Sequence, residues 1–474
     1  MGLALIPENK IKKEARMKKV IVVMLALFLA IPAITYAGSV TSRYDVTIGG
    51  YVKFDVGYTT QTSSVDYRVP NRASTSARQQ INDEFGNLSW ADGETRANIL
   101  VKGPDAWGAK TGAFIEGDFR GVAGSTANYG TFTLRHAFMD FNWVNTRLLI
   151  GHTWQAWGTI PSFNILAFSE HHYMKGATRA PQIRLTQKLA KNFRFQFALT
   201  APYQELLGNS GANFSTVSTA GGAGSTNNII DRTRSLIPDT SLEFVYSSDA
   251  CGKIGPWMLQ FGLGGMIGQE KVTYMDWGTG PAFPTTSYSS TNITKWGSSF
   301  WGYIPIIPEK KGKKGGALGF TGNAFTGQGL GDMLPAYPGS GVGSGAYNQN
   351  NPGAGIGNGT QLALGTNGMI QPVYPLTYGG WMQLNYYWTD SVSSNFLYGF
   401  QQNKLSDAYS RLNANNLITL QNYIVNVMYD VNPAVRLGLE YTYITAGYCT
   451  YAAAAAGDSK GSMQGVRLGA YYFF

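Results

Sequence analysis

Alternation of hydrophobic and polar residues recurs along this 474-residue chain, in runs that end at turn-forming residues. The final run shows the pattern clearly, because Phe474, Tyr472 and Leu468 share one parity and Arg467 has the other. Side chains of a strand point alternately to its two faces, so this strand has one apolar face and one charged face. Such a strand fits a closed barrel with hydrocarbon outside and water inside.

The same reading predicts sixteen strands, the even number that a closed antiparallel barrel of one chain favours. Short connections alternate with long ones, which is typical of barrels with short periplasmic turns and long extracellular loops. Among these are the predicted short turn Ser247–Pro256 and the long loops Gln155–Pro181 and Gly268–Gly297. The expected fold class is therefore an all-β, 16-stranded antiparallel transmembrane β-barrel. Its strands are expected near Tyr44–Tyr58, Thr95–Lys102, Thr111–Arg120, Thr131–Asn142, Thr146–Trp154, Gln182–Leu189, Phe193–Thr200, Thr240–Tyr246, Trp257–Ile267, Ser298–Ile306, Ala317–Thr326, Gly379–Trp388, Val392–Gln401, Leu417–Tyr429, Ala434–Ile444 and Met463–Phe474.

The start of the chain has the features of a secretory signal. Lys18 and Lys19 precede the apolar run Val20–Ile31, and a small-residue cleavage site ends at Ala37. The apolar run has about twelve residues, fewer than the ~20 that a spanning helix requires. We expect residues 1–37 to be a signal peptide, with 1–16 as an upstream start that carries no fold, and residues 38–474 to form the barrel.

The composition agrees with this organisation. Charged residues make up only 14% of the chain, where about a quarter is usual for a soluble domain, and there are 59 glycines. Without residues 1–37 the chain keeps 31 Lys and Arg against 26 Asp and Glu, so the net charge falls from +9 to +5. The basic excess therefore lies partly in the signal, and we expect no nucleic-acid partner.

Parity also assigns the charged residues to a face. A Lys or Arg facing lipid at mid-membrane costs about 2–4 kcal/mol, so the charged parity should face the lumen. In the strand Thr131–Asn142 the alternation is mixed, and we favour Arg135 pointing inward. The lumenal set can act as an anion-attracting field or can brace the wall through ion pairs, and both readings stay open. Its candidate members are Arg96, Glu116, Asp118, Arg120, Arg135, Arg184, Lys188, Arg194, Arg436 and Arg467.

Three segments, Phe114–Asp118, Leu134–Phe138 and Leu149–Trp154, resemble the strands that precede the constriction loop of Gram-negative trimeric porins with sixteen strands, the DcaP-like branch included. The resemblance implies a homotrimer and a third long loop that folds inward to face Arg96, Arg120 and Arg135. Here that loop is Gln155–Pro181, and its candidate constriction residues are Glu170, His171 and His172. The chain departs from the family in lacking the acidic Pro-Glu-Phe-Gly-Gly motif and the N-terminal coiled coil of the DcaP-like branch.

The resemblance further implies that the terminal Phe474 is part of the signal read by the barrel-assembly machinery, and that outer-membrane lipid surrounds the barrel. The expected function is that of an outer-membrane porin, a passive diffusion channel for small anionic or neutral hydrophilic solutes with a mild anion preference. The alternative is a non-conducting scaffold or sleeve for a partner protein such as an electron-transfer cytochrome.

Neither an enzyme nor a metal protein is expected. The adjacent His171 and His172 lack the i, i+4 spacing of a helical metal site, and no Cys-x-x-Cys-His binds haem. The one Gly-x-Ser-x-Gly match, Gly457–Gly461, lacks the strand–turn–helix context of a hydrolase nucleophile. We therefore expect no cofactor, no metal and no catalytic residue.

Overall fold

The computed structural model divides the chain into two units, Met1–Asp45 and Val46–Phe474. The predicted signal peptide falls outside the described residues and stays a prediction. The structure describes residues 44–61, 72–74, 86–121, 131–166, 179–201, 213–214, 229–230, 237–275, 288–330, 361–364, 370–373, 376–404, 417–448 and 457–474.

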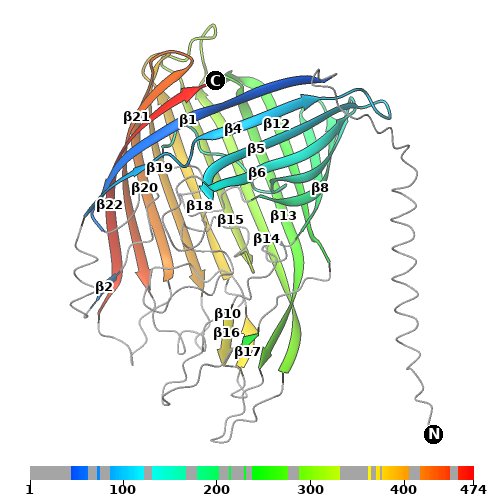
Figure 1. Cartoon of the computed structure of the whole chain (residues 1–474), viewed down its shortest axis with the longest axis vertical. Helices are drawn as coiled ribbons and strands as arrows, with labels where there is room; N and C mark the ends of the chain where they lie inside the picture. The colour runs from blue at the N-terminus through cyan, green and yellow to red at the C-terminus, as the bar shows by residue number, and fades with distance from the viewer. Residues whose placement is uncertain are drawn as a thin grey trace, which may run out of the picture. The chain divides into compact units, whose positions relative to one another are not determined.

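Sixteen long strands form one closed antiparallel barrel in the second unit, which confirms the predicted fold class (Figure 1). Each strand pairs with the next along the chain, so that the strands follow one another around the wall. They are β1 (Asp45–Thr59), β4 (Arg96–Lys102), β5 (Lys110–Gly121), β6 (Thr131–Asn142), β7 (Thr146–Trp154), β8 (Arg179–Ala190), β9 (Phe193–Thr200), β12 (Asp239–Ile254), β13 (Trp257–Met275), β14 (Tyr288–Ile307), β15 (Leu318–Gln328), β18 (Leu376–Tyr387), β19 (Val392–Lys404), β20 (Leu417–Asp430), β21 (Val435–Tyr448) and β22 (Gly457–Phe473).

Six short strands accompany the wall. Two of them extend the barrel sheet, because β2 (Arg72–Ser74) pairs with β22 and β3 (Asn87–Ala91) pairs with β1. The others form two separate hairpins, β10 (Asn213–Phe214) with β11 (Ile229–Ile230) and β16 (Gln361–Leu364) with β17 (Ile370–Val373).

The barrel closes where the last strand meets the first. β22 pairs with β1 from Tyr51–Phe473 to Thr59–Gly465. Beyond the strand end, the backbone N–H groups of Gly50 and Phe474 each donate to the other residue's carbonyl at 3.1 Å. The closed barrel that the sequence predicts therefore has its seam between β22 and β1.

The two faces of β1 show why the wall is stable between lipid and water. Val52, Phe54 and Tyr58 are about half exposed on the outside, whereas Lys53 and Asp55 are 0% and 2% exposed. Closure pairs every wall strand on both sides, so the backbone polar groups are satisfied within the sheet. The alternating side chains then present apolar surface to the outside and polar groups to the inside.

No helix among the residues that the structure describes is long and apolar enough to cross a membrane.

β6 contains a β-bulge that explains its mixed alternation. Its pairing with β5 runs to His136 and resumes at Leu134, which leaves Arg135 out of the ladder. An inserted residue reverses the alternation, so Leu134 before it and Met139 after it are both exposed on the outer face. Arg135 itself is buried at 1% exposure, in the inward orientation that we favoured.

Two of the predicted connections are wrong. The loop predicted at Gly268–Gly297 is largely a hairpin, because β13 continues to Met275 and pairs there with Tyr288 of β14. The turn predicted at Ser247–Pro256 is mostly strand, since β12 runs to Ile254 through a shift in register. The alternation of hydrophobic and polar residues is lost where both faces of a strand meet water, and it is interrupted at a bulge. The hydrogen bonds between the strands continue in both cases.

Candidate functional site: a loop inside the barrel and a basic wall

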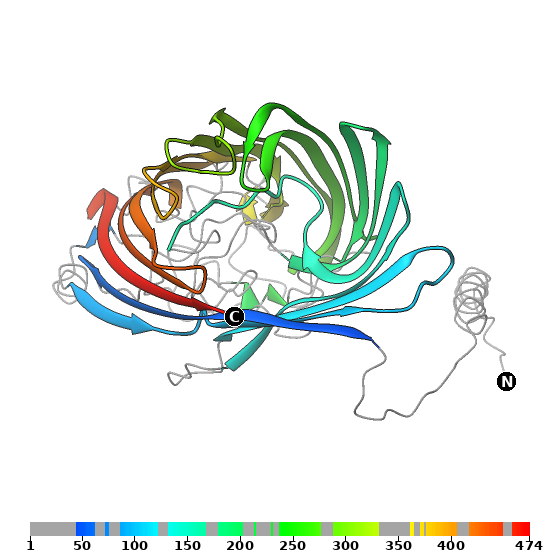
Figure 2. The same ribbon diagram turned by 90° about the horizontal axis from the view of Figure 1, so that it is seen from above.

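The described start of the third long loop, residues 155–166, turns into the barrel. Figure 2, which looks along the barrel, shows its described part inside the ring of strands. Residues 155–166, here called the inner loop, form no regular secondary structure. Irregular backbone inside a barrel needs hydrogen-bond partners from the wall. The wall supplies them from β12 around to β1.

The inner loop begins with a buried anchor at Trp157 and Gly158. Trp157 is 1% exposed and occupies space left by Gly297, where an added Cβ would lie 2.4 Å from the indole ring. The N–H of Gly158 donates to Glu243 Oε1 at 2.7 Å, and its carbonyl accepts from Asn323 Nδ2 at 2.7 Å. Strands β12 and β15 therefore hold the start of the loop.

Amides of the wall hold the middle of the loop. The N–H of Phe163 donates to Gln383 Oε1 at 2.9 Å, and the Gln383 amide donates back to the Phe163 carbonyl. The carbonyl of Asn164 accepts from Asn395 at 3.1 Å and from Asn426 at 2.8 Å. Asn164 has a φ of 49°, a left-handed conformation that asparagine adopts more readily than most residues.

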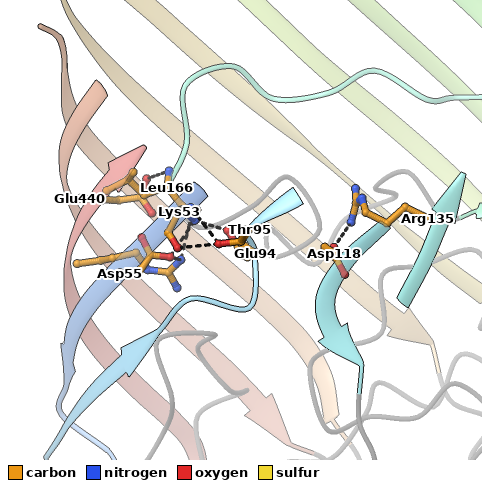
Figure 3. Close-up of polar contacts among 9 residues, drawn as sticks. Lys53, Asp55, Glu94, Thr95, Asp118, Arg135, Leu166 and Glu440 are labelled. Atoms are coloured by element: carbon orange, nitrogen blue, oxygen red, sulfur yellow. Dashed lines mark hydrogen bonds and ion pairs between the residues drawn. The ribbon is translucent and has the colours of Figure 1, made fainter. Parts of the chain in front are cut away.

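The described part of the loop ends at Leu166, which is fully buried. Its N–H donates to Glu440 Oε2 at 2.7 Å. Its carbonyl accepts from Lys53 Nζ at 2.8 Å and from Arg467 Nη1 at 3.1 Å (Figure 3). Charged groups of β21, β1 and β22 thus fix both polar groups of one loop residue, and hydrogen bonds to charged groups are the stronger kind.

The two cations that bind the Leu166 carbonyl belong to a buried group of charges. We call Lys53, Asp55, Glu94 and Arg467 the Lys53 cluster. Lys53 Nζ forms ion pairs with Asp55 at 2.9 Å and with Glu94, and Arg467 Nη1 lies 3.8 Å from Asp55. Both cations are 0% exposed. Each cation balances a carboxylate, as a buried charge requires.

The Leu166 side chain fits against two glycines that face each other on neighbouring strands. Gly438 of β21 is the register partner of Gly469 of β22. A Cβ built on either glycine would lie 2.7–2.9 Å from Leu166 Cδ2. A larger residue would therefore crowd Leu166, and it would also crowd Met428 Sδ beside Gly438 or Asp55 Oδ1 beside Gly469, each at 2.7 Å.

We expect the double substitution G438A/G469A to lower the free energy of unfolding by about 1–3 kcal/mol, the usual range for overpacking a core. Each added methyl group would lie less than 3 Å from Leu166 Cδ2 and from a side chain of the wall. Urea unfolding in detergent micelles, followed by tryptophan fluorescence, measures the change. G315A is the control, because its Cβ would meet atoms no closer than 3.5 Å. Equal stability of both variants would contradict the tight packing of Leu166, Met428 and Asp55 around the two glycines.

Predicted site residues of β4–β6 form a second group on the inner wall. Arg135 binds Glu116 through Nε at 3.0 Å and Asp118 through Nη1 at 2.8 Å, and Figure 3 shows the contact with Asp118. Arg96 Nη1 lies 3.5 Å from Glu116, and its guanidinium stands over the ring of Tyr51. These ion pairs brace the wall, because arginine side chains bind both Glu116 and Asp118.

Three other predicted cations, Arg184, Lys188 and Arg194, lie on β8 and β9. None of them forms an ion pair with a carboxylate within the part of the chain that the structure describes. Arg184 donates instead to Gln182 Oε1 and to the Trp154 carbonyl. These three side chains are the candidates for an anion-attracting field.

The remaining predicted residues have the following places. Arg436 pairs with Asp430 and donates to Asn164 Oδ1 at 3.1 Å, so it also holds the inner loop. Arg120 lies in β5, and its side chain is not described. Phe474 is exposed at the seam. Glu170, His171 and His172 fall outside the described residues, so their role at a constriction stays a prediction.

Sequence reasoning did not single out several residues that hold the loop or the wall. Lys295 and Asp239 form a buried ion pair at 2.7 Å, and Lys295 falls in the wrongly predicted loop. Glu94 also falls in a predicted loop, although its ion pair with Lys53 is buried. Lys53 could have been found from its parity alone. Leu166 has no chemical signature that would have revealed its role. Among the described residues, no group of His, Cys, Asp and Glu could hold a metal ion.

No protein-family model and no curated protein matches the chain. Among solved structures, the outer membrane channel DcaP of Acinetobacter baumannii is similar with a TM-score of 0.62 and 17% identity, over 93% of this chain and 100% of that one.

Two further solved structures are similar at lower scores. The anion-selective porin from Comamonas acidovorans has a TM-score of 0.48 over 91% of this chain and 100% of its own. OprB of Pseudomonas putida has a TM-score of 0.46 over 91% and 94%. Both are 11% identical to this chain. What the similarity to DcaP shows is the fold, which is that of the 16-stranded porins of bacterial outer membranes.

Proposed function

We propose that this protein is an outer-membrane porin, a passive and water-filled channel for small hydrophilic solutes with a mild anion preference. The closed barrel with its apolar outer face and charged inner face supports a membrane channel. Assembly as a homotrimer, contact with outer-membrane lipid and insertion by the barrel-assembly machinery through Phe474 belong to the same proposal.

The anion preference depends on how the inner wall uses its charges. Its buried carboxylates are engaged internally: Asp118 by Arg135, Asp239 by Lys295 and Glu440 by the Leu166 N–H. Arg184 and Arg194 form no ion pair among the described residues, and only the single charge of Glu243 lies near both of them. Positive charge therefore remains available to the lumen, where it raises the local concentration of anions.

The alternative function, a sleeve for a partner protein, requires a lumen wide enough to hold that protein. A partner protein inside the barrel would have to displace the inner loop. That loop is held at Gly158, Phe163, Asn164 and Leu166 by hydrogen bonds to the wall. The docked loop favours a channel that small solutes pass.

A planar-bilayer recording with a salt gradient tests the proposal. We expect ohmic conductance, a reversal potential of anion sign, and closure in three equal steps, because a homotrimer contains three identical pores. The triple variant R184Q/K188Q/R194Q should shift the reversal potential toward cation selectivity. K110Q, which removes one lysine of the exposed Lys110–Asp105 pair, is the control and should leave it unchanged.

Each outcome bears on a separate part of the proposal. A wild-type reversal potential of cation sign would refute the anion preference and leave the channel. Absence of any conductance would refute the channel and favour the sleeve. Single or paired closure steps would refute the trimer.

A further inference from the structure

A cavity of about 620 Å³ lies at the end of the barrel where the connections are short. Residues of the tight turn Trp143–Asn145 line it, as do Gln155 and Ala156 of the inner loop. Trp154 and Trp301 also line it. Its volume is within the range of about 300–1,000 Å³ that small-molecule sites occupy. It lies beside the start of the inner loop and away from the Lys53 cluster.

Four cationic side chains from three neighbouring strands line this cavity: Arg147 of β7, Arg184 and Lys188 of β8, and Arg194 of β9. Lys188 and Arg194 are direct register partners. Like charges at directly opposite positions of an antiparallel pair destabilise a sheet. Arg147 and Arg194 also repel the Arg184 guanidinium, which Glu243 attracts. Wall stability alone therefore does not account for this arrangement.

The charges around the cavity do not cancel. Arg147 is matched by Asp140, at 2.9 Å. Of the other three cations, one is offset by Glu243, the only carboxylate that lines the cavity within the described chain. Two positive charges remain in excess.

The hydrogen-bond donors around the cavity are not all satisfied either. Glu243 accepts from the Gly158 N–H, from Trp301 Nε1 and from Gln196 Nε2. In contrast, the Nε atom of Arg194 is buried and has no hydrogen-bond partner among the described residues. Buried polar groups in proteins are nearly always hydrogen-bonded, so an orphaned guanidinium donor beside a cavity points to a ligand that supplies the acceptor.

We infer that this cavity is a binding site for a small organic phosphate. A phosphate monoester carries close to two negative charges at neutral pH, which matches the two excess positive charges. It also presents three terminal oxygens, one for each of Arg184, Lys188 and Arg194, whereas a carboxylate presents two. The lining also contains apolar residues such as Val144 and Ala156, which can contact the organic part. The inference rests on the proposed function, since it places the cavity on the permeation path and names a solute class.

Calorimetric titration of the purified protein in detergent micelles, in a phosphate-free chloride buffer, tests the site with glycerol 3-phosphate as the probe. We expect saturable binding to the wild type. R194Q and K188Q should each weaken it roughly tenfold or more, because each removes one charge-assisted hydrogen bond. K102Q is the matched control, since Lys102 lies on β4 and does not line the cavity. K102Q should bind the probe as the wild type does.

Separate arms of the titration decide the ligand class. Inorganic phosphate should compete with glycerol 3-phosphate, and succinate should compete much more weakly. Equal competition by succinate would overturn the phosphate assignment. Equal binding by R194Q, K188Q and the wild type, with all three unfolding at the same urea concentration, would overturn the site. Absence of probe binding by a protein that conducts in bilayers would refute the inference alone, whereas absence of conductance would refute the proposed function.

Discussion

Replacing Lys53 by methionine is expected to lower the free energy of unfolding by about 3–5 kcal/mol, the range found when one partner of a buried ion pair is removed. Methionine approximates the length of the side chain but has no charge. Asp55 and Glu94 would then be left in the interior without the cation that pairs with both. The Leu166 carbonyl would also lose its bond to Lys53 Nζ and keep only the bond to Arg467.

Urea unfolding in detergent micelles measures this change, with K110M as the matched control. Lys110 forms an ion pair with Asp105 at 2.8 Å, but both side chains are more than half exposed. Exposed pairs contribute about 0–1 kcal/mol, so K110M should be close to the wild type. The double variant K53M/E94Q should recover part of the loss, because it leaves one buried carboxylate fewer. Equal stability of K53M and K110M would contradict the structural role of the Lys53 cluster.

The wall of this barrel could be predicted from sequence because one constraint acts along every strand. In β1 the outward Val52 and Phe54 alternate with the inward Lys53 and Asp55, since a charge in hydrocarbon is costly at each position. The same constraint gave mixed signals in β6, where the bulge at Arg135 reverses the alternation. A single inserted residue leaves no mark in composition, so its position is found only in the paired structure.

The inner loop shows what alternation cannot predict. Its position is fixed largely by the backbone groups of Gly158, Phe163 and Leu166, and backbone groups are the same in every sequence. The partners of these three N–H groups are Glu and Gln side chains of the wall, and the parity of a residue does not reveal what its side chain binds. The resemblance to porins predicted that the loop folds inward, but the residues that hold it could be identified only from the structure.

The contacts with the inner loop give two carboxylates of the wall a structural role. Taken from sequence alone, Glu243 and Glu440 are inward negative charges that would oppose an anion preference. In the structure Glu243 accepts from Gly158 and Glu440 accepts from Leu166, so both hold the inner loop. The wall therefore uses its negative charge for loop position, while Arg184, Lys188 and Arg194 keep their charge available at the cavity.

Replacing Glu440 by alanine is expected to release the end of the inner loop. Glu440 Oε2 accepts from the Leu166 N–H at 2.7 Å and from Asn426 Nδ2 at 3.0 Å. Loss of a hydrogen bond to a charged group costs about 1.5–3 kcal/mol. Undocked states of the loop should therefore become roughly ten- to a hundredfold more populated. In single-channel recordings this should appear as more frequent excursions to a second conductance level.

E440Q separates the hydrogen bond from the charge. Glutamine removes the same negative charge but keeps an oxygen that can accept from the Leu166 N–H, so its recordings should lie nearer the wild type than those of E440A. If E440A and E440Q fluctuate equally, the charge of Glu440 rather than its bond to the loop determines the effect. If neither variant differs from the wild type, Leu166 is held by Lys53 and Arg467 without help from β21. The comparison thus shows whether the loop end depends on one wall contact or on several.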